Sequence, residues 1–514
     1  MHLVQRAVSH SADPRRPAII TPERSYTYRD LIDASNEVAH RLLDLHADSD
    51  LDASTRDLDG ARVAFLVPSG FEYVAVQWGV WRSGGIAVPL CTAHPRPELE
   101  YVIGDAGVEI VVAHPEYEAI VRPIAADRGL KYIGTGEALS DFSDSRHAIA
   151  RRSGKTLPTI DGDRGALILY TSGTTSKPKG VLTTHRNIEA QVTSLIQAWE
   201  WSGDDHILHV LPLHHIHGII NVLTCALWAG ARCRMLPHFD AEAVWESIST
   251  HDLTLFMAVP TIYTKLIAAW ESAPPERQTA LSAACRKLRL MVSGSAALPV
   301  STLERWREIS GHTLLERYGM TEIGMGISNP LHGDRRPGSV GIPLPGVEIK
   351  LVDERGRQVA PGSPGQIYVR GPGVFQAYWR RPEATRAAFD DGWFRTGDVA
   401  VLEEGYYRIL GRESVDIIKT GGYKVSALEI EEVLRTHPDI LECAVVGVPD
   451  PEWGERVSAA VIARVGADLS LEGLRLWAKE RLAVYKVPTR LQVVSELPRN
   501  AMGKVTKSQV RALF

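Results

Sequence analysis

The chain has 514 residues, of which 44% are hydrophobic and 23% charged, and its formal net charge is −5. At roughly 100–200 residues per domain, this length allows about three structural units and argues against a single small binding module. The weakly negative charge, without a run of Lys and Arg that could neutralise adjacent phosphates, excludes nucleic acid as the expected partner.

The N-terminus, the cysteines and the most apolar stretch predict where the protein is located. Residues 1–20 contain no apolar core of a targeting peptide. The five cysteines are scattered without CxxC spacing, so they indicate neither a disulfide framework nor a zinc site. The stretch Gly218–Ala231 is too short to span a bilayer and is interrupted by Asn221. We expect a cytoplasmic protein without a membrane partner, and a buried helix at this stretch.

Strands and helices alternate through the first part of the chain. Short β-branched runs bounded by Gly or Pro predict strands at 61–68, 85–90, 108–114 and 165–172. Residues 28–45 have the apolar spacing of a helix. This alternation predicts an α/β fold with parallel sheets that are covered by helices.

The pattern changes twice in the second part of the chain. From Gly338 onward, short strands and turns predict a small β-rich subdomain. After Arg412 the α/β pattern returns on a smaller scale, with helices predicted at 427–438 and 471–482 and a strand at 440–449. We therefore place a domain boundary near Arg412.

A loop rich in Gly, Ser, Thr and Lys, Tyr170–Gly180, follows a predicted strand. Its N–H groups, hydroxyls and ammonium groups could surround a polyphosphate. It is not the P-loop of kinases and GTPases, because no Gly-Lys-Ser/Thr stands four residues after a first Gly. For this segment alone, a flexible surface loop with solvated Lys177 and Lys179 is an equally good interpretation.

Three more segments contain polar groups suited to a nucleotide. In Leu314–Gly324, Thr321 and Glu322 could hold phosphate and Mg²⁺ at a strand end, although a helix cap by Thr321 fits as well. Asp398 in GWFRTGD could accept hydrogen bonds from ribose, and Arg412 in GRESVDIIKTGG could donate to the same nucleotide. Considered singly, a turn Asp and a surface Arg are the simpler interpretations.

Taken together and in this order, these four segments and LPRNAMGK near the C-terminus resemble the adenylate-forming superfamily of acyl-CoA synthetases, luciferases and nonribosomal adenylation domains. The resemblance covers essentially the whole chain. It implies a large N-terminal domain of helix-covered sheets with a β-rich subdomain at 1–411, a hinge at 412–416 and a small mobile α+β domain at 417–514. It also implies ATP, Mg²⁺ and coenzyme A.

In this superfamily a carboxylate attacks the α-phosphorus of ATP and expels pyrophosphate, so cations and oriented donors do most of the work. The resemblance implies that Glu322 and Thr171 hold Mg²⁺ and that Lys504 bridges acyl and phosphate oxygens. Without the other motifs, Lys504 would be interpreted as a solvated tail lysine. The implied nucleotide-binding residues, with Tyr318 stacked on adenine, are Thr171, Ser172, Gly173, Thr174, Thr175, Lys179, Gly294, Ser295, Ala296, Tyr318, Gly319, Met320, Thr321, Asp398 and Arg412.

In such enzymes the small domain rotates before the thioester forms, which removes Lys504 and presents a glycine loop to the pantetheine arm. The resemblance places coenzyme A at Lys419, Thr420, Gly421 and Gly422. The hinge departs from the common pattern, because Ser414 stands where relatives carry Asp or Lys and the segment is one residue longer. The hinge residue therefore stays open between Ser414 and Asp416.

The resemblance builds the acyl pocket from three segments, Leu211–Gly218, Phe256–Leu266 and Leu288–Leu298. Period-two alternation in the last segment places Arg289 on the same face as Met291 and Ser293. A guanidinium buried there would need an anion, and the second carboxylate of a short diacid could pair with it through two hydrogen bonds. The alternative is that Arg289 pairs with a protein carboxylate or faces solvent.

The wider sequence closely resembles malonyl-CoA synthetases, including the methylmalonate-activating branch, which use an Arg in the matching strand for the distal carboxylate. The resemblance assigns this role to Arg289 and places His215 at the channel between the acid and coenzyme A sites. The hydroxyl groups of Ser293 and Ser295 are expected to donate hydrogen bonds to the acid. Packing beneath the loop is the expected role of the neighbouring His214 and His217.

We therefore predict a monomer or weak homo-oligomer that ligates malonate, and also methylmalonate, to coenzyme A, giving malonyl-CoA, AMP and pyrophosphate. Within the fold, the alternatives are another short acid or the loading of a carrier protein. From other classes, the alternatives are a phosphotransferase that releases ADP and a nucleotide sensor without catalysis. The missing P-loop spacing disfavours the first, and the presence of Glu322 and Lys504 disfavours the second.

Overall fold

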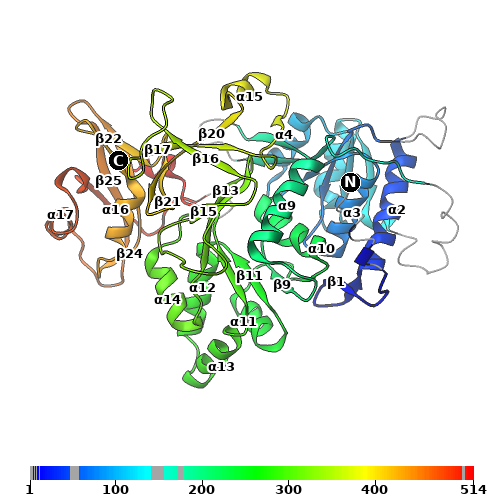
Figure 1. Ribbon diagram of the computed structural model, residues 1–514, viewed down its shortest axis with the longest axis horizontal. Helices are drawn as coiled ribbons and strands as arrows, with labels where there is room; N and C mark the ends of the chain where they lie inside the picture. Colours follow the sequence, from blue (N-terminus) through cyan, green and yellow to red (C-terminus); the bar gives the residue numbers. More distant parts are fainter. Residues whose placement is uncertain are drawn as a thin grey trace.

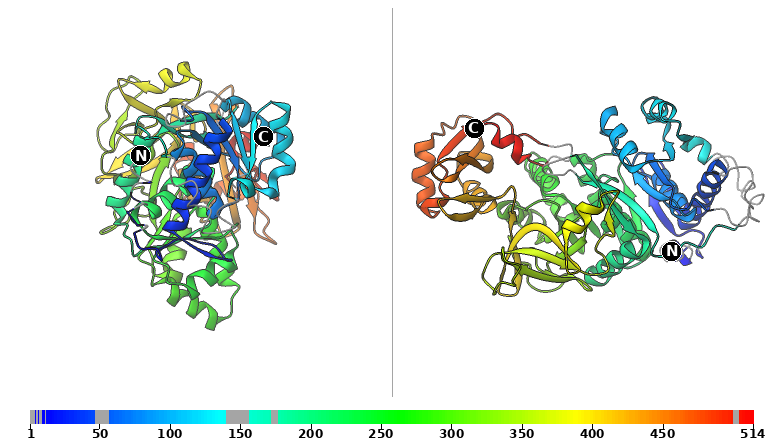
Figure 2. Two further views of the ribbon diagram at one scale, coloured as in Figure 1. Left: turned by 90° about the vertical axis from the view of Figure 1, so that its right-hand side faces the viewer. Right: turned by 90° about the horizontal axis from the view of Figure 1, so that it is seen from above.

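The computed structural model describes residues 4, 6, 9–10, 12–46, 57–139, 156–171, 177–499 and 504–514. Figure 1 shows the N-terminal sheet, drawn blue to cyan, at one end of the molecule and the small C-terminal domain, drawn orange to red, at the other. The right-hand view of Figure 2 shows the same order along the long axis, with green and yellow elements between them. The predicted α/β fold, with a large N-terminal part and a small C-terminal domain, is confirmed.

The N-terminal sheet has seven strands in the order β18-β8-β7-β4-β3-β5-β6. Its central strands are apolar and buried, which is typical of parallel strands covered by helices on both faces. The strands are β3 (Arg62–Leu66), β4 (Ile86–Pro89), β5 (Ile110–Ala113), β6 (Lys131–Gly134), β7 (Gly165–Thr171), β8 (Lys179–Thr184) and β18 (Ala377–Tyr378). The helical segments between its strands are α3 (Phe71–Arg82), α4 (Arg96–Ala106), η2 (Pro115–Tyr117), α5 (Glu118–Asp127) and α6 (Thr135–Ala138).

The central sheet has nine strands in the order β15-β14-β13-β12-β11-β9-β10-β1-β2. Its strands are β1 (Pro17–Ile20), β2 (Ser25–Thr27), β9 (His206–His209), β10 (Arg232–Met235), β11 (Leu255–Ala258), β12 (Leu290–Ser293), β13 (Leu315–Met320), β14 (Gly324–Ser328) and β15 (Ile342–Pro343). The helical segments of this part of the chain are α2 (Tyr28–His46), α9 (His185–Trp199), η3 (His217–Thr224), α10 (Cys225–Ala229), α11 (Ala241–Thr250), α12 (Pro260–Glu271), α13 (Pro275–Cys285) and α14 (Val300–Ser310). A turn joins β13 directly to β14, so the alternative that Thr321 caps a helix is wrong.

The chain after Gly338 forms the predicted β-rich part and then the small domain. The β-rich sheet contains β16 (Glu348–Val352), β17 (Gly365–Arg370), β19 (Phe389–Asp390), β20 (Trp393–Glu403) and β21 (Tyr406–Arg412), and α15 (Pro382–Ala388) lies beside it. The small domain has its own sheet and buried core. Its elements are β22 (Ile417–Thr420), β23 (Tyr423–Ser426), α16 (Ala427–Leu434), β24 (Ile440–Asp450), β25 (Gly454–Ala463), α17 (Leu471–Lys479), η4 (Val484–Lys486), β26 (Arg490–Val493) and α18 (Lys507–Arg511).

The apolar stretch Gly218–Ala231 is buried and helical, as predicted, but its first part is a π-helix. Wide turns of this kind occur often at functional sites. In the described part of the chain, no helix combines the length and the apolar character that crossing a membrane requires. All five cysteines are buried and free.

Candidate active site

Two parallel strands of the central sheet bring the predicted acid and nucleotide segments together. In β12 and β13, Ser293 lies opposite Glu316. The loop that follows β12, residues 294–296, is therefore next to Arg317 and Tyr318 in β13. Since the carboxyl ends of parallel strands meet at one edge of a sheet, both segments contribute to a site at this edge.

Arg317 is a buried cation without an anionic partner in the described part of the chain. It is 3% exposed, and its Nε and Nη1 donate no hydrogen bond to any described residue. Nη2 donates to Ser295 Oγ at 3.2 Å. A Cβ on Gly294 would lie 2.6 Å from the guanidinium carbon, so any other residue at this position would require the Arg317 side chain to move. Burial lowers the pKa of Arg317 to about 9. Because an unpaired buried charge is costly, two free N–H groups indicate a site for an anionic group of a ligand.

His217, the first residue of η3, lies near this cation. His217 Nδ1 lies 3.2 Å from Ser295 Oγ, and its Nε2 has no partner among the described residues. Burial and the charge of Arg317 lower the pKa of His217, so its imidazole is neutral and can donate one N–H. Burial also lowers the pKa of His215, with a further contribution from Lys504. His217, expected to be a packing residue, therefore belongs to the pocket.

The hydroxyl side chains assigned to the acid occupy different environments. Ser295 bridges His217 and Arg317, whereas Ser293 is fully buried and its Oγ has no partner among the described residues. Ser295 also has φ of +70°, an unfavourable conformation for a residue with a Cβ. Ser295, which accepts a hydrogen bond from Arg317, therefore has a clearer link to this cation than Ser293 has.

Asp398 is the centre of the predicted ribose site. The Tyr318 hydroxyl donates to Asp398 Oδ2 at 2.6 Å, and Arg412 Nε donates to Asp398 Oδ1 at 3.0 Å. Asp398 and Arg412 lie opposite each other in the antiparallel pair β20 and β21, which sets their separation. The structure therefore brings these three predicted residues together. Of the other predicted residues of this region, Ala296 is exposed, and the half-buried ones are Gly319, Met320 and Thr321.

Glu322 occupies the turn between β13 and β14. The Tyr378 hydroxyl donates to Glu322 Oε1 at 2.9 Å, and burial raises the pKa of Glu322. Lys179 Nζ lies 5.2 Å from the centre of the Tyr378 ring, and Thr171 is opposite Lys179 in the pairing of β7 with β8. A carboxylate and a hydroxyl are oxygen ligands of the kind that Mg²⁺ prefers, so these residues fit the metal. The remaining predicted phosphate ligands, Ser172, Gly173, Thr174 and Thr175, lie outside the described residues.

Lys504 lies close to both the acid pocket and the ribose site. Burial, followed by the positive charges of Arg317 and Arg412, lowers the pKa of Lys504 to about 8. The charge of Lys504 in turn helps to lower the pKa values of His215 and His217. An ammonium group in this position is near the place where an acid and a phosphate would meet. The interpretation of Lys504 as a solvated tail residue is therefore wrong.

The structure corrects the prediction for Arg289. Its Nε and Nη2 donate to the Asp205 carboxylate at 2.7 Å each, and its Nη1 donates to the carbonyl oxygen of Trp199 at 2.9 Å. The Asp205 side chain is only 3% exposed, so this pair is part of the framework. Arg289 also precedes β12, which begins at Leu290, so the alternation of that strand does not determine its direction. The alternative of pairing with a protein carboxylate is the one that the structure shows.

The predicted coenzyme A loop is the hairpin that joins β22 to β23. Its turn residues Gly421 and Gly422 have φ of +55° and +82°, a conformation that favours glycine. The Gly421 N–H donates to the carbonyl oxygen of Trp453 at 2.9 Å, which is a contact within the small domain. At the hinge, Asp416 Oδ2 accepts from the backbone N–H of Arg412 at 3.0 Å. The roles of this hairpin and of the hinge stay predictions.

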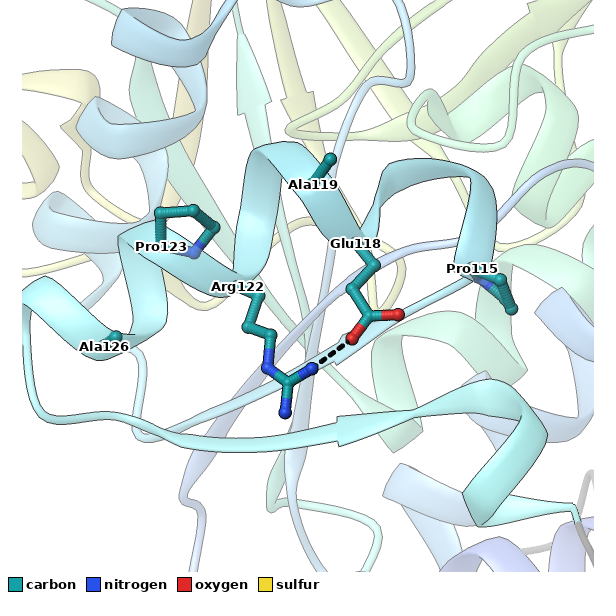
Figure 3. Close-up of a pocket in the computed structure, with 6 residues that line it drawn as sticks. All are labelled: Pro115, Glu118, Ala119, Arg122, Pro123 and Ala126. Carbon is teal, nitrogen blue, oxygen red and sulfur yellow. Dashed lines mark hydrogen bonds and ion pairs between the residues drawn. The ribbon is translucent and has the colours of Figure 1, made fainter.

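Two hollows in the described surface differ in their relation to this site. One, of about 530 Å³, includes Tyr378, which contacts Glu322, and the other lies away from the site. This second hollow, of about 570 Å³, lies beside η2 and α5 and is lined by Pro115, Glu118, Ala119, Arg122, Pro123 and Ala126. Figure 3 shows Glu118 and Arg122 paired along α5, where Arg122 Nη1 donates to Glu118 Oε1 at 2.6 Å. Such an exposed pair contributes little stability, and none of the residues discussed above lines this hollow. The signal for the site is the unpaired buried Arg317.

Comparisons with known proteins match nearly the whole length of the chain. The AMP-binding enzyme family matches residues 6–379, and the AMP-binding enzyme C-terminal domain matches residues 429–504. The chain is 48% identical to the mitochondrial malonate-CoA ligase of Bos taurus over 97% of this chain and 88% of that protein. It is 44% identical to the malonate-CoA ligase of Arabidopsis thaliana over 88% of this chain and 78% of that protein. ATP-bound MatB from Rhodopseudomonas palustris superposes with a TM-score of 0.87 at 35% identity, over 99% of this chain and 98% of that one.

Proposed function

This chain belongs to the AMP-binding enzyme family, and we propose that it ligates malonate to coenzyme A through a malonyl-AMP intermediate, with methylmalonate as a second substrate. The observation that carries the choice of acid is Arg317, a buried guanidinium with two unpaired donors beside Ser295 and His217. A monocarboxylic acid has no second anion for these donors. The similarity to two malonate-CoA ligases supports the same acid.

The distal carboxylate of malonate pairs with Nε and Nη1 of Arg317 through two parallel hydrogen bonds. Ser295 and His217 lie beside the guanidinium and add polar side chains without a further charge. Arg317 and Tyr318 are consecutive in β13, so the acid and nucleotide sites lie close together. This proximity favours a short diacid, whose two carboxylates are a short distance apart.

In the first half-reaction, an oxygen of the proximal carboxylate attacks the α-phosphorus of ATP, and the bond to pyrophosphate breaks. Tyr318, Asp398 and Arg412 hold the nucleoside, and the Lys504 ammonium stabilises the negative charge that develops between acid and phosphate. Mg²⁺ held by Glu322 and Thr171 would neutralise phosphate charge. The products are malonyl-AMP and pyrophosphate.

In the second half-reaction, the thiolate of coenzyme A attacks the malonyl carbonyl carbon and AMP leaves. The hairpin of residues 419–422 is proposed to line the pantetheine arm after the small domain has moved. The glycines of its turn allow a thin ligand to approach the backbone. We also propose a monomer or weak homo-oligomer. A cytoplasmic location stays a prediction, to which the mitochondrial relative from Bos taurus lends no support.

The experiment that tests this proposal identifies the products. With ATP, Mg²⁺ and malonate, the protein should release pyrophosphate and form malonyl-AMP, and added coenzyme A should give malonyl-CoA and AMP by mass spectrometry. Formation of ADP and phosphate would instead identify a phosphotransferase. ATP binding without pyrophosphate release on any acid would identify a nucleotide sensor. Turnover that requires a carrier protein would exclude coenzyme A as the acceptor.

A further inference from the structure

A carboxylate of the small domain caps a helix of the large domain. Glu432 lies on α16, and its Oε2 accepts a hydrogen bond from the backbone N–H of Val300 at 3.2 Å. Val300 is the first residue of α14, and the preceding Pro299 offers that helix no side-chain cap. Arg435 Nη1 donates to Glu432 Oε1 at 2.5 Å and so holds the carboxylate in place. A carboxylate at a helix N-terminus satisfies a free N–H group and interacts favourably with the helix dipole.

The same helix holds the segment that carries Lys504. Glu431, the neighbour of Glu432, has a side chain that is 4% exposed and accepts hydrogen bonds from Lys507 and from the backbone N–H of Val445. Lys507 also donates to the carbonyl oxygen of Val445 at 2.6 Å. Lys507 is three residues after Lys504 and begins α18. Helix α16 therefore contacts the large domain through Glu432 and the segment that carries Lys504 through Glu431.

Other contacts also join the domains. Ser426 Oγ donates to the carbonyl oxygen of Leu410 in β21, close to the hinge. A further contact, between two exposed side chains, is weaker than the Glu432 contact. Lys424 of β23 pairs with Glu354 of the β-rich part, but the side chains are 47% and 69% exposed. Ion pairs this exposed contribute little, because solvent and salt screen them. The Glu432 contact is formed with a backbone group at the start of a helix and is partly buried. Ser426 pairs with Ile417 directly after the hinge, so its bond to Leu410 joins the domains only where the chain already connects them. The Glu432 contact is therefore the one suited to hold the domains in register.

From these contacts we propose that Glu432 is a positioning residue, which docks the small domain by capping α14 and opens before the thioester step. While the cap is closed, the small domain holds Lys504 at the acid and nucleotide sites. The inference rests on the proposed function, because it assigns different domain arrangements to the two half-reactions. It predicts that weakening the cap affects malonyl-AMP formation and spares malonyl transfer to coenzyme A.

The first test measures both half-reactions in Glu432→Ala. Pyrophosphate release in the absence of coenzyme A should fall about tenfold, as expected for loss of a helix-capping carboxylate at a partly buried site. Malonyl-CoA formation from supplied malonyl-AMP should be unchanged or faster. The matched control is Glu429→Ala on the same helix, because Glu429 pairs with Lys486 inside the small domain and should leave both rates unchanged. Equal losses in both half-reactions would overturn the proposal.

The second test approaches the contact from the large domain. Pro299→Asp supplies α14 with its own capping carboxylate, which also repels Glu432. This variant should show the same selective loss of adenylation as Glu432→Ala. The double variant should be no worse than Glu432→Ala alone, because the two changes remove one shared contact. Additive losses would contradict a direct contact between Glu432 and this helix end.

The third test needs no catalysis. The native cysteines are all buried, so cysteines introduced at the exposed Glu276 of α13 and Glu472 of α17 can be labelled with a pair of dyes. Single-molecule energy transfer should show one main state in the otherwise unchanged protein and a second, undocked state in Glu432→Ala. An unchanged distribution in Glu432→Ala would overturn the proposal. If the wild-type protein formed no malonyl-AMP, the proposed function would fail, and this measurement would still decide the role of Glu432.

Discussion

Replacing Arg317 with methionine should remove the preference for a diacid and leave the rest of the site intact. Methionine fills much of the volume of the arginine stem but offers no donor to a carboxylate. In the protein without ligand, Nε and Nη1 have no partner among the described residues, so methionine breaks only the contact with Ser295. The change therefore acts mainly on the distal carboxylate of the substrate.

The size of the effect follows from the burial of Arg317. Removing one partner of a buried charge pair costs about 3–5 kcal/mol, because the other charge is left buried and unpaired. At about 1.36 kcal/mol for each factor of ten, this corresponds to a decrease in kcat/KM for malonate of roughly 150-fold to 5,000-fold. Acetate and butyrate do not use the guanidinium, so their kcat/KM values should change by less than about threefold.

Stability should change in the opposite direction to activity. A buried charge without a partner carries an uncompensated desolvation cost, and an apolar side chain of similar volume removes that cost, so the Tm of Arg317→Met should stay the same or rise. Arg289→Met is the matched control, because Arg289, unlike Arg317, is paired with a buried carboxylate and should affect stability rather than the choice of acid. It leaves the buried Asp205 without its charged partner, so the Tm of Arg289→Met should fall while its preference among acids is kept.

The assay is pyrophosphate release with ATP, Mg²⁺ and each acid, for the wild-type protein and both methionine variants, alongside thermal unfolding. Equal loss of activity on malonate and butyrate in Arg317→Met would contradict a contact between Arg317 and the distal carboxylate. Selective loss of activity on malonate in Arg289→Met would have the same meaning. It would indicate that Arg289 binds the distal carboxylate, although the structure shows Arg289 paired with Asp205.

Three further predictions follow from the nucleotide half of the site. Lys504→Ala should lower malonyl-AMP formation by about 100-fold or more while sparing malonyl transfer from supplied malonyl-AMP, and equal losses would contradict the role. Because Lys504 acts as an ammonium and its pKa is lowered to about 8, kcat/KM for ATP should fall as the pH rises above 8, and Lys504→Arg should remove this alkaline decline. Tyr378→Phe removes a donor to the Glu322 carboxylate, so the concentration of Mg²⁺ needed for half-maximal rate should rise about tenfold, and an unchanged Mg²⁺ dependence would exclude a positioning role.

Elements with strong local patterns were predictable from the sequence. The runs at 61–68 and 108–114 became β3 and β5, and the periodic segment at 28–45 became α2. Both patterns depend on local burial, because a strand buried on both faces is apolar throughout and a helix buried on one face has apolar residues at helical spacing. A few consecutive residues are enough to show either pattern. The π-helical start of the stretch at 218–231 was not predictable, because the apolar pattern does not distinguish hydrogen bonds to the fourth from those to the fifth residue.

The nucleotide site was predictable in outline, and the acid site was not. Asp398, Arg412 and Tyr318 meet as the resemblance implied. The choice of Arg289 failed because its partner, Asp205, is 84 residues away and no local pattern announces the pair. A signal for Arg317 was present, since a Glu and an Arg interrupt the otherwise apolar start of β13, where burial of a charge demands a reason.

Whether Arg317 binds a second carboxylate is tested most simply by pyrophosphate release from the wild-type protein with ATP, Mg²⁺ and coenzyme A. The acids to compare are acetate, butyrate, benzoate, malonate, methylmalonate and succinate. The buried, unpaired donors of Arg317 predict strong turnover that is confined to malonate and its 2-methyl homologue. A monocarboxylic acid as the best substrate would contradict the assignment of Arg317 to a second carboxylate.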